Sequence, residues 1–276
     1  MTAPLLELND GQQIPALGFG TYKIYGPDAP ALMVEAIDAG YRLLDTATTY
    51  RNEGEVGEAV RMSSVPRDEL VVTSKLRGGD HGYDEALRSV DGSLERLGLD
   101  RLDLFLIHWP QPPIGKYVET WKAFIRMREE GTVSSIGVSN FLPEHLDRLV
   151  EETGVAPAVN QVEMHPFLAQ AEQRAGDARH GVVTESWSPL GRGTELLDRP
   201  EIIETADKHG RTPAQIVLRW HVQLGSIPIP KSATPERFRG NLEVFDFELD
   251  TDDLDRIATL ETGQRIGGDP VDEVQL

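Results

Sequence analysis

Short apolar segments of strand length alternate with longer segments of helical period along nearly the whole chain. Between the short segments apolar residues recur every three or four positions, as in Leu87, Val90 and Leu94, which is the period of an amphipathic helix. The strand-like segments are 17–20, 41–44, 70–74, 102–107, 135–138, 158–161, 182–186 and 226–229. Strands that alternate with helices form a parallel sheet, and eight of them close a barrel. We therefore predict a single (β/α)8 TIM barrel that forms one domain over residues 1–276.

Local turn and capping signals add detail to this α/β fold. Two short alternating segments surround Asn9-Asp10-Gly11, and such a turn predicts an N-terminal β-hairpin that precedes the barrel as a lid. Asn52 is placed to cap the helix that begins at Glu53. Thr212-Pro213 and Thr234-Pro235 predict helix starts with proline at the first position.

Composition excludes several classes of function. The chain has 276 residues, with 27 Lys and Arg against 46 Asp and Glu, so its formal net charge is −19. This charge repels nucleic acid and anionic membranes. The chain contains no cysteine, which removes disulfides, thiolate metal sites and thiol nucleophiles. We expect a cytoplasmic monomer that holds no metal and whose partner is a small molecule.

Four polar groups follow the ends of neighbouring predicted strands: Asp45, Tyr50, Lys75 and His108. Barrel enzymes build their sites at this end of the strands. A phenol is a poor acid at neutral pH until a cation stabilises its anion, and Lys75 supplies such a charge with Asp45 to hold it. His108 would donate a hydrogen bond to a substrate oxygen beside Tyr50. Singly, each residue also suits a capping, packing or snorkelling role, so the prediction of a site depends on their joint occurrence.

A proton donor without a nucleophile needs a partner reagent, and a hydride donor fits. Six segments carry specific motifs: 38–50, Ser74-Lys75, Ile107-His108-Trp109-Pro110, IGVSNF at 136–141, AVNQVEMHP at 158–166 and IPKSATPERFRGN at 229–241. In these segments the chain resembles the aldo-keto reductase family, and within it the bacterial 2,5-diketo-D-gluconate reductase branch. The resemblance implies reduction of aldehydes and ketones, broadly of small carbonyl compounds, keto-sugars or diketones, with NADPH/NADP+ as the cofactor.

By the same resemblance, Asp45, Tyr50, Lys75 and His108 match the family's catalytic tetrad, with Tyr50 as the general acid. The matching cofactor positions fall into five groups. Ser139, Asn140 and Gln161 would bind the nicotinamide carboxamide; Trp187 would stack on the ring; Ser188, Leu190 and Gly193 would approach the pyrophosphate; Lys231, Ser232 and Arg237 would hold a 2′-phosphate, and Asn241 would lie near the adenine.

Aromatic residues of the first and fourth barrel loops, Tyr22, Tyr25 and Trp109, together with the tail from Gly263, are expected to line the substrate mouth. Two other functions stay open at this point. One is a nicotinamide-binding regulatory subunit of the same barrel family with little turnover. The other is an aldolase-like barrel in which Lys75 forms a Schiff base.

Overall fold

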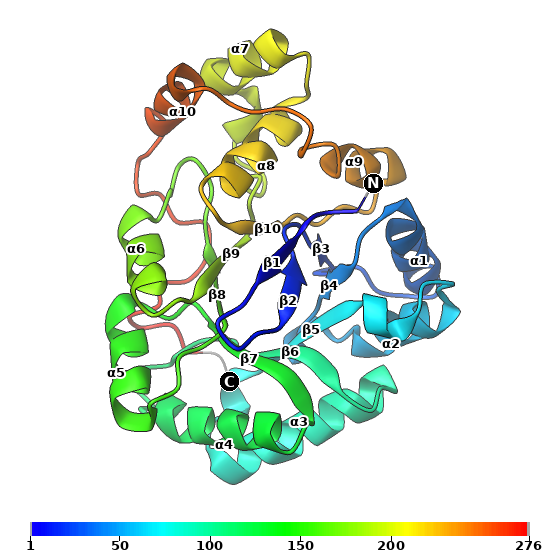
Figure 1. The fold of residues 1–276 in the computed structure, drawn as a ribbon, viewed down its shortest axis with the longest axis vertical. Coiled ribbons are helices and arrows are strands. Elements are labelled where there is room, and N and C mark those ends of the chain that lie inside the picture. Colours follow the sequence, from blue (N-terminus) through cyan, green and yellow to red (C-terminus); the bar gives the residue numbers. More distant parts are fainter. Residues whose placement is uncertain (1, 275–276) are drawn as a thin grey trace.

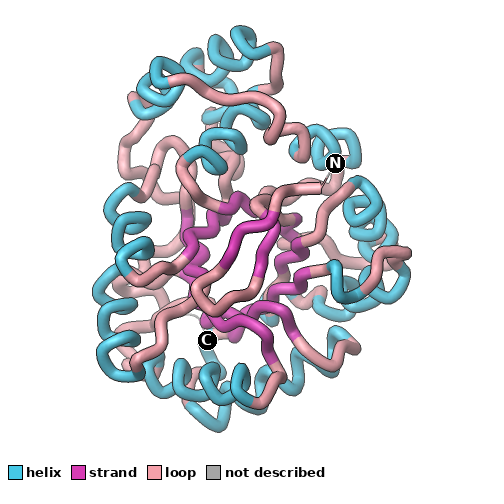
Figure 2. Tube along the Cα trace, in the orientation of Figure 1, coloured by secondary structure: helices cyan, strands magenta, loops and turns pink. Residues whose placement is uncertain are grey.

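Eight parallel strands form the centre of the molecule, as Figures 1 and 2 show for a computed structural model that describes residues 2–274. They are β3 (Phe19–Gly20), β4 (Leu43–Asp45), β5 (Val71–Leu76), β6 (Leu102–Ile107), β7 (Val133–Ser139), β8 (Val159–Glu163), β9 (Val183–Trp187) and β10 (Ile227–Ile229). Each strand pairs in parallel with the next along the chain. The amides of Gly18 and Gly20 donate to Pro228 O (3.1 Å) and Pro230 O (3.0 Å), which joins the first strand to the last. The predicted (β/α)8 barrel is confirmed.

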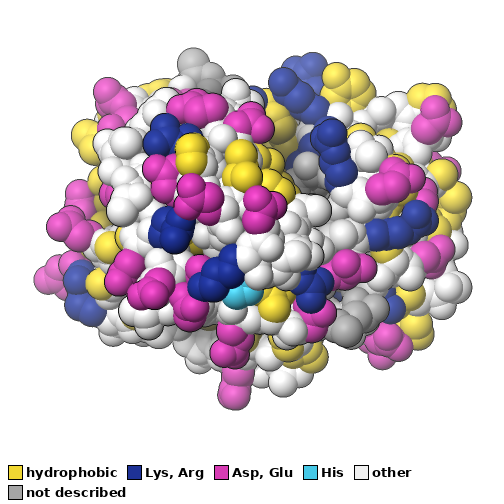
Figure 3. Space-filling view, turned by 90° about the horizontal axis from the view of Figure 1, so that it is seen from above, with side chains coloured by type: hydrophobic (Ala, Val, Ile, Leu, Met, Phe, Trp, Pro, Cys, Tyr) yellow, Lys and Arg dark blue, Asp and Glu magenta, His cyan; other side chains and the backbone are white. Residues whose placement is uncertain are grey.

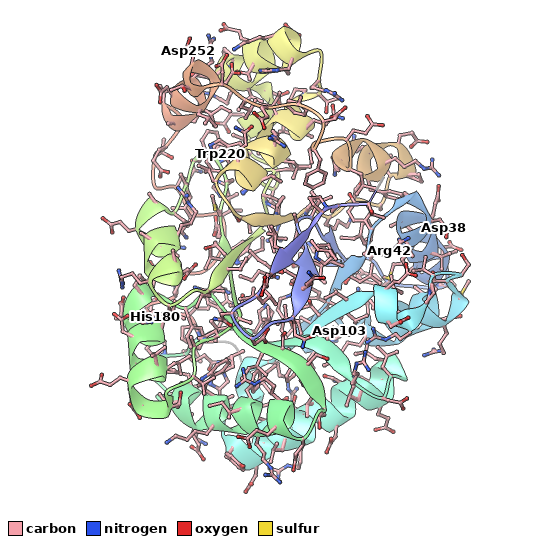
Figure 4. The ribbon with its side chains drawn as sticks, viewed as in Figure 1. Asp38, Arg42, Asp103, His180, Trp220 and Asp252 are labelled. Carbon is pink, nitrogen blue, oxygen red and sulfur yellow. The ribbon has the colours of Figure 1, made fainter. Side chains whose placement is uncertain are left out.

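The helices surround this barrel (Figure 2). They are α1 (Ala29–Ala39), α2 (Glu53–Met62), α3 (Tyr83–Leu97), α4 (Tyr117–Glu129), α5 (Pro143–Thr153), α6 (Ala171–Arg179), α7 (Pro200–His209), α8 (Pro213–Gln223), α9 (Pro235–Asn241) and α10 (Thr251–Ala258), with 3-10 turns η1 (Thr48–Tyr50), η2 (Arg67–Glu69), η3 (Gly78–Asp80) and η4 (Leu196–Asp198). Their apolar faces pack on the strands, and Trp220 of α8, labelled in Figure 4, belongs to the cluster beneath α7, α8 and α10. Within residues 2–274 no helix has both the length and the apolarity to span a bilayer.

The N-terminal hairpin closes one end of the barrel. Its strands β1 (Leu5–Glu7) and β2 (Gln13–Pro15) pair antiparallel, and they lie across the barrel opening that faces the viewer in Figure 1. Leu8 and Ile14 pack with buried residues at the beginnings of barrel strands, among them Leu43. Asn9 Nδ2 also donates to Pro157 O at 2.7 Å, just before β8. The predicted lid therefore covers the N-terminal ends of the strands and leaves the carboxyl ends for a site.

The predicted helix start at Thr212 is confirmed. The Thr212 hydroxyl accepts from the Gln215 amide (3.3 Å), and the Gln215 side chain accepts from the Thr212 amide (2.9 Å). The predicted side-chain cap at Asn52 is wrong. Its side chain makes no capping bond; its Nδ2 donates to Thr21 O and Ile24 O, both at 2.8 Å. Those loop carbonyls are buried and need donors, so tertiary contacts take the side chain away from its own helix.

Two glycines of α2 provide a matched test of helix packing. A Cβ built on Gly57 would lie 1.7 Å from Leu97 O at the end of α3, whereas one on Gly54 would lie no closer than 3.8 Å to any atom. We expect Gly57→Ala to destabilise the protein by ~1 to 3 kcal/mol or more because the backbone of α3 must move. Gly54→Ala should be neutral or stabilise by up to ~1 kcal/mol through helix propensity. Urea unfolding measures both, and equal free energies would contradict the packing argument.

Candidate active site

A buried ion pair lies at the carboxyl ends of β4 and β5. Lys75 Nζ donates to Asp45 Oδ1 at 2.7 Å, to Asp45 Oδ2 at 2.8 Å and to Thr46 O at 2.9 Å, so all three ammonium hydrogens are used. The Lys75 side chain is fully buried and that of Asp45 is 5% exposed. Burial by itself lowers the pKa of Lys75, but the Asp45 carboxylate beside it raises that pKa above the ordinary value. The sequence predicted this pair, and the ammonium stays charged.

Tyr50 lies above the pair in the turn η1. The Lys75 ammonium is 5.0 Å from the centre of the Tyr50 ring, and Thr48 in the same turn donates its hydroxyl to Lys75 O at 2.9 Å. Burial raises the pKa of the Tyr50 phenol, and the charge of Lys75 acts in the opposite direction. The phenol therefore keeps its proton at neutral pH, while the cation is placed to stabilise the anion that remains when the proton leaves.

His108 follows β6 and faces the same phenol, with ring centres 6.0 Å apart. Burial, and then the charge of Lys75, lower the pKa of His108 to about 3. The imidazole is thus neutral and carries one N–H. Its Nδ1 has no hydrogen-bond partner among the described residues. A neutral imidazole beside a phenol polarises an oxygen that binds between them, but it does not serve as the stronger acid.

The carboxyl ends of β7, β8 and β9 carry a second set of hydrogen-bonded side chains. Asn140 Nδ2 donates to His108 O at 3.0 Å, and Asn140 Oδ1 accepts from Trp187 Nε1 at 2.8 Å, which fixes the indole. Gln161 Nε2 donates to Asp45 Oδ2 at 2.8 Å and to Glu185 Oε2 at 2.9 Å. Glu185 was missed by sequence reasoning. The only signal in the sequence was a carboxyl group inside the predicted strand 182–186, which is otherwise uncharged.

These groups open into a cavity of about 750 Å³ at the carboxyl ends of the strands. Of the predicted residues, its walls include Asp45, Tyr50, His108, Asn140, Gln161, Trp187, Ser188, Leu190, Lys231, Tyr22 and Trp109. Tyr22 packs edge-on against Tyr50 with ring centres 5.1 Å apart. Two residues at the strand ends, Asn140 (φ 61°) and Ser188 (φ 51°), adopt left-handed backbone conformations. Such strain in residues other than glycine is common where the backbone is shaped for a ligand.

The other predicted residues lie outside the cavity walls. Lys75 is buried beneath them, and Ser139 donates its hydroxyl to Gln161 O at 2.7 Å. Tyr25 is 67% exposed. Gly193 lies in the loop after β9, and Ser232 Oγ accepts from the Thr234 amide at 3.1 Å. Arg237 is exposed on α9, whereas Asn241 is buried on the same helix, where its side chain bonds the Tyr41 hydroxyl.

The C-terminal tail forms one wall of the cavity and is held by a second missed residue, Glu163. The Glu163 carboxylate accepts from the amides of Ile266 and Gly267 (2.9 Å for Gly267) and from His165 Nε2 at 3.0 Å. Burial raises the pKa of Glu163, but these bonds outweigh it and lower the pKa overall. A Cβ on Gly267 would lie 2.4 Å from the Trp187 ring, so the glycine lets the tail lie against the indole. The tail was predicted to lie at the substrate mouth, and the structure places Gly267, Gly268 and Glu273 of the tail in the cavity wall.

The fold and this geometry define a (β/α)8 barrel with a protonated phenol and a buried ion pair at a cavity on the carboxyl side of its strands. The Aldo/keto reductase family model matches residues 16–262. The chain is 57% identical to a 2,5-diketo-D-gluconic acid reductase B of Corynebacterium over 97% of this chain and 96% of the relative. It is 48% identical to the methylglyoxal reductase DkgA of Salmonella typhimurium over 96% of both chains.

Solved structures agree with the sequence comparisons. A structure of a Gox0644 variant in complex with NADPH is 43% identical, with a TM-score of 0.93 over 98% of both chains. An aldo-keto reductase of Bombyx mori in complex with NADP is 33% identical, with a TM-score of 0.90 over 97% of this chain and 96% of the other. The chain belongs to the aldo/keto reductase family. It is accordingly an NADP-dependent oxidoreductase whose cofactor is NADPH/NADP+.

Substitution of Glu163 tests the hold on the tail. Glu163→Gln replaces the anionic acceptor by an amide, one end of which repels the tail N–H groups. Loss of charge-assisted bonds worth ~1.5 to 3 kcal/mol should raise the open population of the tail at least about tenfold. Trypsin cleavage after Arg265, followed by mass spectrometry under native conditions, should accelerate by that factor.

The matched control is Glu261→Gln. Glu261 also accepts from backbone amides, those of Ala169 and Gly263, but it is exposed at the start of the tail. Its variant should be cleaved at close to the rate of the unmodified protein. Equal acceleration in both variants would show that the buried carboxylate has no special part in holding the tail.

Proposed function

We propose that this protein reduces aldehydes and ketones to alcohols with NADPH, and that Tyr50 donates the proton. The observation that carries the proposal is the buried Lys75–Asp45 pair directly beneath a cavity-lining phenol. Because the pair is buried, it does not contribute to the solubility of the surface. It lies at the barrel end where enzymes of this fold have their active sites. The family assignment supports the same reaction class.

The bound cofactor supplies the hydride, and the side chains control the proton. Tyr50 is protonated at neutral pH and donates to the carbonyl oxygen as charge develops on it. Lys75 lowers the energy of the resulting phenolate, and Asp45 keeps the ammonium in place through two hydrogen bonds. His108 is neutral and donates its N–H to the same oxygen. The substrate carbonyl therefore binds between Tyr50 and His108.

The cavity fits a dinucleotide of this kind. Asn140 and Gln161 offer amide groups at the strand ends, Trp187 offers a flat ring fixed by Asn140, and Lys231 adds a cation at the rim. We assign carboxamide binding to Ser139, Asn140 and Gln161, and ring stacking to Trp187. We assign the pyrophosphate to Ser188, Leu190 and Gly193, the 2′-phosphate to Lys231, Ser232 and Arg237, and the adenine surroundings to Asn241.

Small carbonyl compounds, diketones and keto-sugars are the proposed substrates. Two relatives support this range, because they are a 2,5-diketo-D-gluconic acid reductase and a methylglyoxal reductase. Tyr22 and Trp109 line the cavity together with Tyr50, and Tyr25, in the same loop as Tyr22, is exposed. Lys23 and Arg192 lie near the Tyr22 ring, 5.4 and 5.2 Å from its centre, and add positive charge at the mouth.

For the setting of the enzyme we propose a single-domain cytoplasmic monomer without nucleic-acid or membrane partners. The net charge of −19 supports the absence of nucleic-acid and anionic-membrane partners, and Figure 3 shows acidic and basic side chains interspersed over the visible face. The Schiff-base alternative is disfavoured, because all three Lys75 ammonium hydrogens are hydrogen-bonded and the raised pKa keeps the amine protonated. An NADPH-consumption assay with aldehydes, ketones, diketones and keto-sugars separates a reductase from a regulatory subunit.

Tyr50→Phe tests the proton donor directly. The substitution removes the hydroxyl and keeps the ring that packs on Tyr22 and His108. Carbonyl reduction should fall ~10²- to 10⁴-fold, the range for loss of a general acid, while NADPH affinity stays near that of the unmodified protein. Steady-state rates and fluorescence titration measure the two effects. Near-normal turnover would exclude Tyr50 as the acid.

Arg237→Ala tests the 2′-phosphate assignment. Arg237 is exposed and makes no ion pair among the described residues, whereas Arg239 on the same helix pairs with Glu35. Loss of Arg237 should weaken NADPH binding by ~1.5 to 3 kcal/mol and leave NADH binding nearly unchanged, because only NADPH carries the added phosphate. Arg239→Ala is the matched control and should alter neither. Equal losses for both cofactors in Arg237→Ala would refute the assignment.

A further inference from the structure

Glu185 is a buried carboxyl group that none of the assigned roles uses. It lies on β9 inside the barrel, 1% exposed, in register with Gln161 of β8 on one side and Ile227 of β10 on the other. Oε2 accepts from Gln161 Nε2 at 2.9 Å, and Oε1 has no hydrogen-bond partner among the described residues. Burying a carboxyl group with an unpaired oxygen is costly, so a purely structural position would favour an apolar residue.

The partner of Glu185 is the amide of Gln161, whose orientation is thereby determined. Nε2 has two hydrogens, and it donates one to Asp45 Oδ2 at 2.8 Å and one to Glu185 Oε2. The reversed amide would point its oxygen at the Asp45 carboxylate, which cannot donate a hydrogen bond, so the bond to Asp45 would be lost. The hydrogen-bonding atom that remains is Oε1, an acceptor, on a residue that lines the cavity. The two carboxyl groups together thus determine what Gln161 offers to a ligand.

The charges around Glu185 favour its uncharged form. The ionisable groups that face it are Asp45 on β4 and Lys75 on β5, while β10 contributes the apolar Ile227. Lys75 is already committed to Asp45 through two hydrogen bonds. Burial first, and then repulsion by Asp45, raise the pKa of Glu185 to about 8, against the opposing effects of Gln161 and Lys75. At neutral pH one cation and one anion therefore remain in this part of the barrel.

We propose that Glu185 is a positioning residue: in its uncharged form it holds the Gln161 amide against Asp45, so that Gln161 Oε1 accepts a hydrogen bond from the carboxamide of the cofactor. The proposal rests on the proposed function, since it assigns the amide oxygen to the nicotinamide end of NADPH or NADP+. It has a second consequence. Ionised Glu185 adds a negative charge beside the cavity, which favours the cationic oxidised nicotinamide over the neutral reduced one.

The test uses the full-length protein and measures dissociation constants for NADP+ and NADPH by tryptophan fluorescence between pH 6 and 10. Glu185→Leu removes the acceptor and keeps the site filled, so NADP+ affinity at pH 7 should fall about 3- to 10-fold, as for one lost hydrogen bond. Glu185→Gln retains an acceptor oxygen and should restore affinity to within about twofold of the unmodified protein. Undiminished NADP+ affinity in Glu185→Leu would overturn the proposal.

The pH dependence of cofactor binding distinguishes a positioning role from a merely structural one, because a merely structural residue would not produce it. The ratio of the NADPH to the NADP+ dissociation constant should rise through about pH 8 in the unmodified protein and stay flat in Glu185→Gln. The control is Asp177→Asn. Asp177 is another buried carboxyl group, which accepts from Asn160, Gln173 and Thr184 away from the cavity, and its variant should keep the rise.

Each outcome has a separate meaning. A flat ratio in the unmodified protein, or the same rise in Glu185→Gln, would overturn the charge assignment of Glu185. If Glu185→Leu does not fold, the comparison of Glu185→Gln with the unmodified protein decides the proposal. Failure of the unmodified protein to bind either nucleotide would instead refute the proposed function, so the two failures are distinguishable.

Discussion

The buried ion pair between Lys75 and Asp45 is the interaction on which the site depends. Taking both charges out of water costs several kcal/mol each in proteins, and only good geometry compensates for that. Here the ammonium has three acceptors and the carboxylate also accepts from Gln161. A single charge left alone in this position would be far more costly than the pair. The same pair sets the electrostatic environment of Tyr50, His108 and Glu185.

The barrel supplies the rigidity that such a pair requires. Asp45 and Lys75 are the last and next-to-last residues of two adjacent strands, so their backbone positions are held by the parallel hydrogen-bond ladder. The hairpin covers the opposite end of the barrel, where Leu8 and Ile14 belong to a buried apolar cluster with residues of the strands. Polar side chains are then concentrated at the open end, which carries a neutral imidazole, a protonated phenol and a fixed cation.

Charge is distributed differently on the outside of the molecule and at the site. The chain carries a net charge of −19, and charged residues labelled in Figure 4, such as Asp38 and Asp252, lie on the outer helices. The cavity walls instead carry three cations, Lys23, Arg192 and Lys231, against the carboxylates of Asp45 and Glu273. An anionic ligand is thus attracted by a few local cations, while polyanions that cover a wide surface are repelled. This arrangement suits a phosphorylated nucleotide better than nucleic acid.

The sequence by itself determined the eight strands, the hairpin, the capping at Thr212 and the placement of Asp45, Tyr50, Lys75 and His108 together, because periodicity and strand ends are local properties of the chain. Only the tertiary structure decided the hydrogen bonds of Asn52, the hold of Glu163 on the tail and the contact of Gln161 with Glu185. These join residues far apart in the sequence: 103 positions separate Glu163 from Ile266. A buried polar group takes whichever partner the fold brings within reach, and nothing in its neighbours along the chain specifies that partner.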